Sequence, residues 1–395
     1  MRGVAGNANL IRVTITCFLA YAILSGLLSQ IGTLSAAMSD FFSKPLTETS
    51  ARFSWLSLGI TVGSVLSIIV YEWLPIKKVF LLCYLFFILA LIGSSLFNLW
   101  QWLPISFFIA GCSASLGLNT AAVTLSLLFK ERQRAAILLS TDICFASAGI
   151  LAAPGAAALL RSGFSWNSSF LVLAAIAAFV MLLALFSRYP PTARELKTQK
   201  TPDKWHFSIY FCCFGLAMYL LGQIAMLIWL PNYIEHSLMG TRGQGAAAIS
   251  AYWTGMALGQ ITLVFFLIRF TAQQLLILIT IASFVASIAL WQLSSLINVV
   301  SITLLLGLCN AGVLKLTMSF SASLVSHPQR VITTLLFCSS LGQMASPLVS
   351  STIVTMFDIQ SGLQFVTVCY LFAASSIIFA VFKVPNHMTL FKKEN

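Results

Sequence analysis

Long apolar runs, separated by short polar stretches, follow one another along the whole chain. Each run has about 20 residues, the length that an α-helix needs to cross roughly 30 Å of hydrocarbon. Strands of a membrane barrel would instead show segments of about ten residues with alternating polarity. The pattern predicts twelve transmembrane helices, over residues 10–34, 52–73, 79–98, 102–128, 135–160, 166–188, 206–231, 246–268, 272–294, 297–325, 331–356 and 361–384.

Composition supports this interpretation. With 59% hydrophobic residues, 8% charged residues and a mean hydropathy of +0.95, a water-soluble fold of 395 residues could not cover its surface with polar groups. The first run is long and has no evident small-residue cleavage site, so we expect it to remain as helix one and not to act as a cleaved signal. The fold class expected is an all-α membrane protein.

One spacing of 196 residues relates the two halves of the chain. It pairs Gly26 with Gly222 and the Gly59-x-x-x-Gly63 motif with Gly255-x-x-x-Gly259. It also pairs Gly111 with Gly307 and Gln133-Arg134 with Gln329-Arg330. A shared register over several segments favours duplication, and hence two six-helix repeats. We expect an N-terminal bundle over 1–188, a cytoplasmic linker over 189–205 and a C-terminal bundle with a short cytoplasmic tail over 206–395.

The basic residues predict the orientation, because cytoplasmic loops retain Lys and Arg. If the N-terminus is inside, 17 of the 22 basic residues fall on the cytoplasmic side. We therefore expect a bacterial inner-membrane protein with both termini in the cytoplasm. The net charge of +12 is spread over short loops, which favours anionic membrane lipid over nucleic acid as the partner.

Residues typical of enzymes and metal sites are scattered. The nine cysteines lie inside apolar runs, where they pack as small hydrophobes, and the four histidines lie at the ends of runs. The chain has no G-x-x-x-x-G-K-[ST] phosphate loop. We expect no metal, no cofactor and no catalysis.

Short stretches carry a family resemblance. The run Lys130-Glu131-Arg132-Gln133-Arg134, followed by Thr141-Asp142, and the turn Glu72 to Lys77 resemble TsgA-type permeases of the major facilitator superfamily, near its fucose-permease branch. The resemblance implies a monomer with a cavity between the halves, lined by helices 1, 4, 7 and 10, that opens to each side in turn. The usual Asp-Arg pair between helices two and three is absent here, and only Glu72 and Lys77-Lys78 correspond to it. The candidate gating residues are Glu72, Arg132, Arg134 and Arg330.

Two charges lie deep in predicted spans, where each costs at least about 2.5 kcal/mol. Asp142 lies about 12 Å, and Lys315 about 18 Å, from the cytoplasmic edge at 1.5 Å per residue. Asp142 is either a proton carrier or a hydrogen-bond acceptor that ties helices together near the cytoplasmic gate. Lys315 either attracts an anionic substrate group, compensates Asp142 or extends its stem toward water.

Polar side chains at helical spacing complete the candidate site. Tyr219 and Gln223 share one face of helix seven. Amides and hydroxyls suit a small polar solute, although each one alone could simply bond a neighbouring helix. The predicted substrate-binding residues are Gln30, Asn119, Tyr219, Gln223, Asn310 and Lys315.

The sequence therefore predicts a secondary transporter that moves a small polar solute by alternating access, coupled to protons. The resemblance implies a sugar or related metabolite, whereas Lys315 favours an anion or a zwitterion such as an amino acid. A channel or a non-transporting nutrient sensor on the same fold is the alternative of another class.

Overall fold

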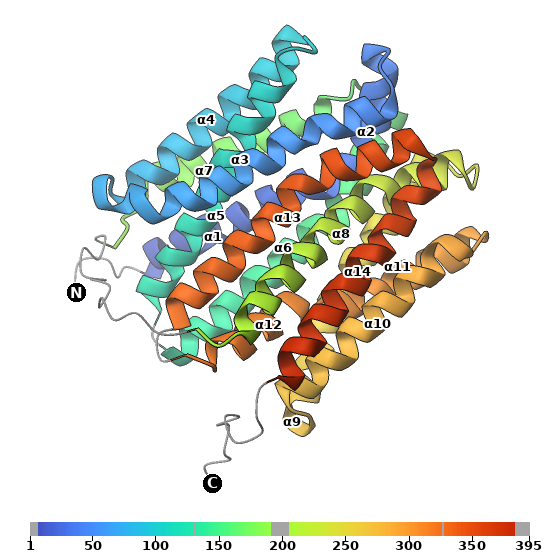
Figure 1. Cartoon of the computed structure of the whole chain (residues 1–395). Coiled ribbons are helices and arrows are strands. Elements are labelled where there is room, and N and C mark those ends of the chain that lie inside the picture. The colour runs from blue at the N-terminus through green and yellow to red at the C-terminus, as the bar shows by residue number, and fades with distance from the viewer. Residues whose placement is uncertain (1–6, 130, 191–204, 326–327, 384–395) are drawn as a thin grey trace. The chain divides into compact units, whose positions relative to one another are not determined.

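The computed structural model describes residues 7–129, 131–190, 205–325 and 328–383, and within these ranges the regular elements are all α-helices (Figure 1). The predicted all-α membrane fold is confirmed. Ten segments of the described chain are long and apolar enough to cross a membrane. Two further helices, of 28 and 29 residues, occupy the remaining predicted spans.

Seven helices lie in the described part of the first half of the chain. Prolines precede two of them, where a missing backbone N–H costs nothing, and Asn98 ends one in the left-handed conformation with φ of 47°. Their bounds are α1 Asn7–Ser29, α2 Ile31–Phe42, α3 Leu46–Trp73, α4 Ile76–Phe97, α5 Leu103–Leu128, α6 Glu131–Arg161 and α7 Ser168–Leu185.

Seven more helices follow among the described residues of the second half. Thr271 begins one with a reciprocal capping box with Gln274, and Asp358 caps another by accepting from Ser361 N at 2.7 Å. Their bounds are α8 Ser208–His236, α9 Arg242–Arg269, α10 Ala272–Gln292, α11 Leu296–Asn310, α12 Val313–Ala322, α13 Pro328–Met356 and α14 Ile359–Phe382.

Two predicted spans are interrupted. The span 10–34 is divided at Gln30, between α1 and α2, and the span 297–325 is divided at Ala311-Gly312, between α11 and α12. Hydropathy cannot reveal these breaks because apolar residues continue on both sides. The ends of the other ten spans agree with the prediction to within six residues.

Contacts divide the chain into two compact units. The first contains Met1–Lys197 and Thr241–Ser250, and the second contains Thr198–Gly240 and Ala251–Asn395. In the first unit α5 packs against α3, α4 and α1, and in the second α8 packs against α13 and α14. The predicted bundles 1–188 and 206–395 stay a prediction, and residues 191–204 of the predicted linker lie outside the described residues.

Helix crossings repeat at the 196-residue spacing. A Cβ on Gly59 or Gly63 would lie closer than 3.0 Å to the backbone of Phe108 or Cys112 on α5. The same contacts recur in the second unit, where Gly255 meets Leu304 and Gly259 meets Leu308 on α11. Each number in the second set exceeds its counterpart by 196, so the structure repeats these backbone contacts in the register that the sequence predicted.

Candidate functional site

A cluster of five buried polar side chains lies within the second unit. Tyr219 and Gln223 come from α8, Tyr252 from α9, Asn310 from the last position of α11 and Tyr370 from α14. None of the five is more than 8% exposed. Four helices therefore direct polar groups to one point in an otherwise apolar interior.

Asn310 is the centre of the hydrogen-bond network. Its Nδ2 donates to the hydroxyls of Tyr252, at 3.1 Å, and Tyr370, at 2.9 Å. Gln223 Nε2 donates to the Tyr252 hydroxyl at 2.6 Å. The Tyr219 hydroxyl donates to the Asn310 carbonyl at 3.1 Å, which satisfies an acceptor left over where α11 ends.

One atom of this network lacks a partner. Asn310 Oδ1 is buried and accepts no hydrogen bond from any described group. With the amide turned over, Nδ2 would take that position, so one Asn310 atom awaits a further partner in either orientation. A buried polar atom without a partner costs about 1–3 kcal/mol, and a solute hydroxyl or N–H would remove that cost.

Space beside the cluster is small. A cavity of about 10 Å³ is lined by Tyr219, Thr280, Ser283 and Tyr370, among others. That volume holds about one water molecule. The Tyr219 and Tyr370 rings stack with their centroids 5.8 Å apart. In this conformation the cluster is closed.

The corresponding positions of the first unit are apolar. Subtracting 196 from the five residue numbers gives buried Ile23, Leu27, Leu56, Ala114 and Ala174. The 196-residue register also holds for these helices. Gly26 contacts Leu173, and the corresponding Gly222 contacts the corresponding Cys369. The repeat therefore packs without polar groups here, so the cluster is a feature of the second unit alone.

Gln30 resembles Asn310 in its setting. It lies at the break between α1 and α2, is 2% exposed, and its Nε2 donates to none of the described groups. Gln343 Nε2, on the uninterrupted helix α13, also lacks a hydrogen-bond partner among the described groups. In each unit, then, the interrupted span carries an amide with an unsatisfied buried atom.

Asn119 has a different environment. Its Nδ2 donates to Ser67 Oγ at 3.2 Å, so this amide bonds α5 to the neighbouring α3. Ser115, one turn earlier, likewise lies 2.8 Å from Ser64 Oγ. These contacts hold the α3–α5 crossing together and leave the predicted role of Asn119 in substrate binding untested.

The two deep charges belong to different units. Asp142 lies on α6 and is half-buried. Lys315 is exposed in the first turn of α12, on the face that carries Ser319 and opposite buried Thr317 and Leu316. The predicted interaction between Asp142 and Lys315 stays a hypothesis.

The predicted gating residues lie on helices, with Glu72 on α3, Arg132 and Arg134 on α6, and Arg330 on α13. Their side chains lie outside the described residues, so their role stays a prediction. In the described part of the chain, no group of three or more His, Cys, Asp or Glu side chains is arranged to hold a metal ion.

Sequence reasoning missed Tyr252 and Tyr370. Both lie in apolar runs, where an aromatic residue predicts core packing and nothing more. Comparing the two halves would have found them, because at the 196-residue spacing Tyr252 corresponds to Leu56 and Tyr370 corresponds to Ala174.

Comparisons with known proteins agree with this architecture. Residues 13–237 match the Major Facilitator Superfamily. The "Protein TsgA homolog" of Yersinia pestis is 24% identical over 373 residues, which cover 92% of this chain and 94% of that protein.

Solved structures share the fold at low identity. The nucleoside transporter NupG has a TM-score of 0.71 at 18% identity, covering 95% of this chain and 99% of that one. A bacterial homolog of the human lysosomal transporter Spinster, in an inward-facing occupied conformation, has a TM-score of 0.74 at 14% identity, covering 96% and 98%. A D-xylose-proton symporter has a TM-score of 0.72 at 11% identity, covering 97% and 98%.

Proposed function

Because the chain belongs to the major facilitator superfamily, a family of multi-pass membrane transporters, we propose that it moves a small polar solute by alternating access, driven by a proton gradient. The observation that carries the proposal is the buried cluster around Asn310. Burying Asn310 Oδ1 without a hydrogen-bond partner is costly, and the first unit has apolar residues at the positions of all five cluster residues. A binding role accounts for a cost that packing alone does not require.

The chemistry of the cluster favours a solute rich in hydroxyl groups. Asn310 and Gln223 supply amide groups, and Tyr219, Tyr252 and Tyr370 supply hydroxyls and ring faces. These groups are uncharged, and they form directional hydrogen bonds to hydroxyl or N–H groups. NupG and the xylose symporter are described as carriers of a nucleoside and a sugar, which supports a sugar or a related metabolite.

Lys315 favours a second substrate class. Its ammonium is exposed in the first turn of α12, where the positive end of the helix dipole adds to its charge. An anionic or zwitterionic solute such as an amino acid would gain from both. The two classes are separable by measuring which solutes the protein moves.

Asp142 is the proposed proton site, since a half-buried carboxyl group in a span can bind and release a proton. Gln30 is a further proposed substrate-binding residue. Glu72, Arg132, Arg134 and Arg330 are the proposed gating residues. The proposal places the protein in a bacterial inner membrane, as a monomer with both termini in the cytoplasm.

The test is solute-dependent proton movement. Liposomes containing the purified protein and a trapped pH dye would be challenged in turn with sugars, nucleosides, amino acids and organic acids. We expect one pool to move protons, and Asp142→Asn to abolish the signal while solute still binds. Asp358→Asn is the matched control, because it removes an exposed helix-capping carboxylate.

Three results would contradict part or all of the proposal. A solute that protects the protein from heat but moves neither itself nor protons would indicate a sensor. Flux that does not saturate with solute concentration would indicate a channel. Saturable uptake that Asp142→Asn does not change would support transport but would exclude proton coupling through this carboxylate.

A further inference from the structure

A basic cavity lies at one end of the first unit, apart from the polar cluster. It has a volume of about 530 Å³ and lies between the turn that joins α3 to α4 and the segment that follows α7. Lys77 and Arg188 line it, together with Pro75, Ser187 and Tyr189. No carboxylate is among its described lining residues, so its charge is positive.

Lys77 is held in place at this cavity. Its Nζ donates to the carbonyl of Leu185 at 2.6 Å. That carbonyl belongs to the last residue of α7, where the negative end of the helix dipole attracts a cation. An ammonium group has three N–H donors, so two remain for another acceptor.

Arg188 is positioned through its backbone. Its N–H donates to Asn9 Oδ1 at 2.8 Å, and Asn9 Nδ2 donates back to its carbonyl at 2.9 Å. These two bonds fix the segment after α7 to α1 and leave the exposed guanidinium available at the rim of the cavity. Guanidinium groups match phosphate oxygens with two parallel hydrogen bonds.

Exposed apolar residues lie next to the lining residues in the sequence. Trp73, two residues before Pro75, is 79% exposed, and Phe186, immediately before Ser187, is 67% exposed. Aromatic residues with exposed faces at the ends of membrane helices are typical of the level of the lipid headgroups. A cationic pocket next to exposed apolar residues suits a molecule that carries both an anionic head group and an apolar tail.

We propose that this cavity binds the phosphate of an anionic phospholipid between Lys77 and Arg188, with the acyl chains lying on the exposed apolar surface of α7. Leu182 and Leu185, exposed on α7, continue the apolar surface away from the two cations. The residues that line this cavity include none of those proposed above for solute binding or proton coupling.

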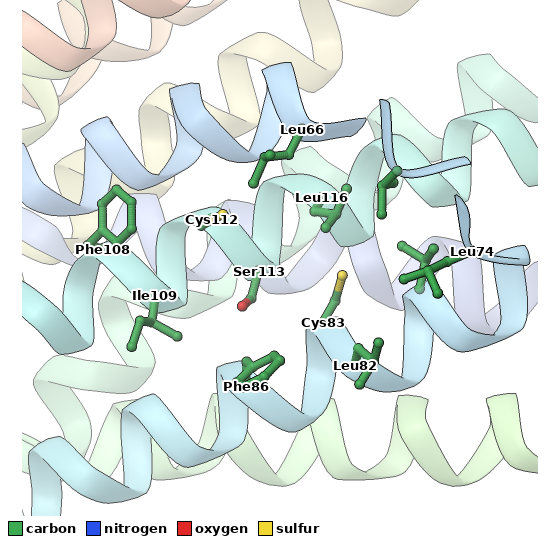
Figure 2. A pocket seen from close by; sticks show the side chains of 12 residues that line it. Leu66, Leu74, Leu82, Cys83, Phe86, Phe108, Ile109, Cys112, Ser113 and Leu116 are labelled. Carbon is green, nitrogen blue, oxygen red and sulfur yellow. The ribbon is translucent and has the colours of Figure 1, made fainter. Parts of the chain in front are cut away.

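A second cavity of the same unit provides a comparison. Figure 2 shows an apolar groove of about 390 Å³, where Leu66 of α3, Cys83 and Phe86 of α4, and Cys112 of α5 converge. Phe86 is nine residues from Lys77, which places it on the opposite face of α4 at 3.6 residues per turn. Because no lysine or arginine lines this groove, we expect it to bind lipids without selecting an anionic headgroup.

The experiment measures the thermal stability of the purified full chain in detergent. Dioleoyl phosphatidylglycerol, dioleoyl phosphatidylcholine and inorganic phosphate would be added separately. We expect a saturable rise in Tm with phosphatidylglycerol and none with the other two. Lys77→Gln and Arg188→Gln should each raise the half-saturating lipid concentration about tenfold.

Lys78→Gln is the matched control, because Lys78 is the next residue along the chain, is exposed and does not line the cavity. It should leave the half-saturating concentration unchanged. Lys77→Gln also removes a helix-capping bond, so each variant is compared with its own lipid-free Tm, and Arg188→Gln keeps both backbone bonds to Asn9. The proposal is overturned if Lys78→Gln weakens binding equally, if phosphatidylcholine stabilises as well, or if phosphate alone gives the shift.

Discussion

Asn310 donates from Nδ2 to the hydroxyl of Tyr370, 2.9 Å away, and so links the end of α11 to the middle of α14. The residues at the same places in the first repeat are Ala114 and Ala174, which can form no such bond. Two halves that share a helix register differ here in polarity. The hydrogen bond between Asn310 and Tyr370 is therefore specific to the second half of the chain.

Replacing Asn310 tests that relationship. Asn310→Ala gives the position the residue of the first repeat and removes the donor to Tyr252 and Tyr370. We expect a fall in stability of about 1–3 kcal/mol, from tyrosine hydroxyls left short of a partner, together with loss of transport. Uptake into liposomes, normalised to folded protein, is the measurement. Cys309→Ala, a buried neighbour outside the network, is the control, and normal uptake by the Asn310 variant would exclude the cluster as the binding site.

Two buried tyrosines separate hydrogen bonding from packing. Tyr252→Phe removes the acceptor for Gln223 Nε2 and one of the two acceptors for Asn310 Nδ2, so we expect a loss of about 1–3 kcal/mol. Tyr84→Phe removes a buried hydroxyl that has no hydrogen-bond partner among the described groups, so it should leave stability unchanged or raise it. Thermal unfolding in detergent compares them. If the two variants change stability equally, the hydrogen bonds of Tyr252 contribute nothing beyond the packing of its ring.

The sequence predicted the spans well because twenty apolar residues in a row have few other structures open to them. The breaks at Gln30 and Ala311-Gly312 could not be predicted, since no proline marks them and the hydropathy is continuous. At the second break the hydroxyl of Tyr219, from another helix, satisfies the Asn310 carbonyl, a tertiary contact that hydropathy does not reveal.

For the site, the sequence supplied Tyr219, Gln223 and Asn310 because polar residues stand out against an apolar background. It could not bring them together, since they are separated by up to 91 residues and only the fold places them in contact. The sequence could equally not reveal that the Asn119 amide bonds to Ser67 on the adjacent helix, and its role in substrate binding stays a prediction.

The repeated glycine contacts predict equal damage in the two units. Gly59→Ala and Gly255→Ala each place a methyl group against the backbone of the crossing helix, at Phe108 and Leu304. We expect each to cost about 1–3 kcal/mol through overpacking. Gly155→Ala, with no atom within 4 Å of its added Cβ, should be neutral or stabilising because alanine favours helix. Thermal unfolding measures all three, and a harmless change at Gly59 or Gly255 would contradict the crossing described here.

The ion pair between Asp40 on α2 and Arg242 at the start of α9 predicts a small energetic effect. The two side chains are 69% and 31% exposed, and exposed pairs contribute about 0–1 kcal/mol. Asp40→Asn and Arg242→Gln should each lower Tm slightly, and the double variant should cost no more than the larger single change. Raising the salt concentration should reduce the difference from the native protein. A loss of several kcal/mol in either variant would mean that the pair is buried during some part of the cycle.

Lys315 distinguishes the two substrate classes. Lys315→Asn gives the position the residue of the first repeat, Asn119, and removes one positive charge from the first turn of α12. If the solute is anionic, we expect KM to rise about tenfold, equivalent to about 1.4 kcal/mol of lost attraction. If the solute is a neutral sugar, KM should stay the same. Ser319→Ala, on the same exposed face of α12, controls for changes of polarity without charge. Competition assays with a matched sugar and its acid derivative would decide between them, because only the acid should lose affinity in the Lys315 variant.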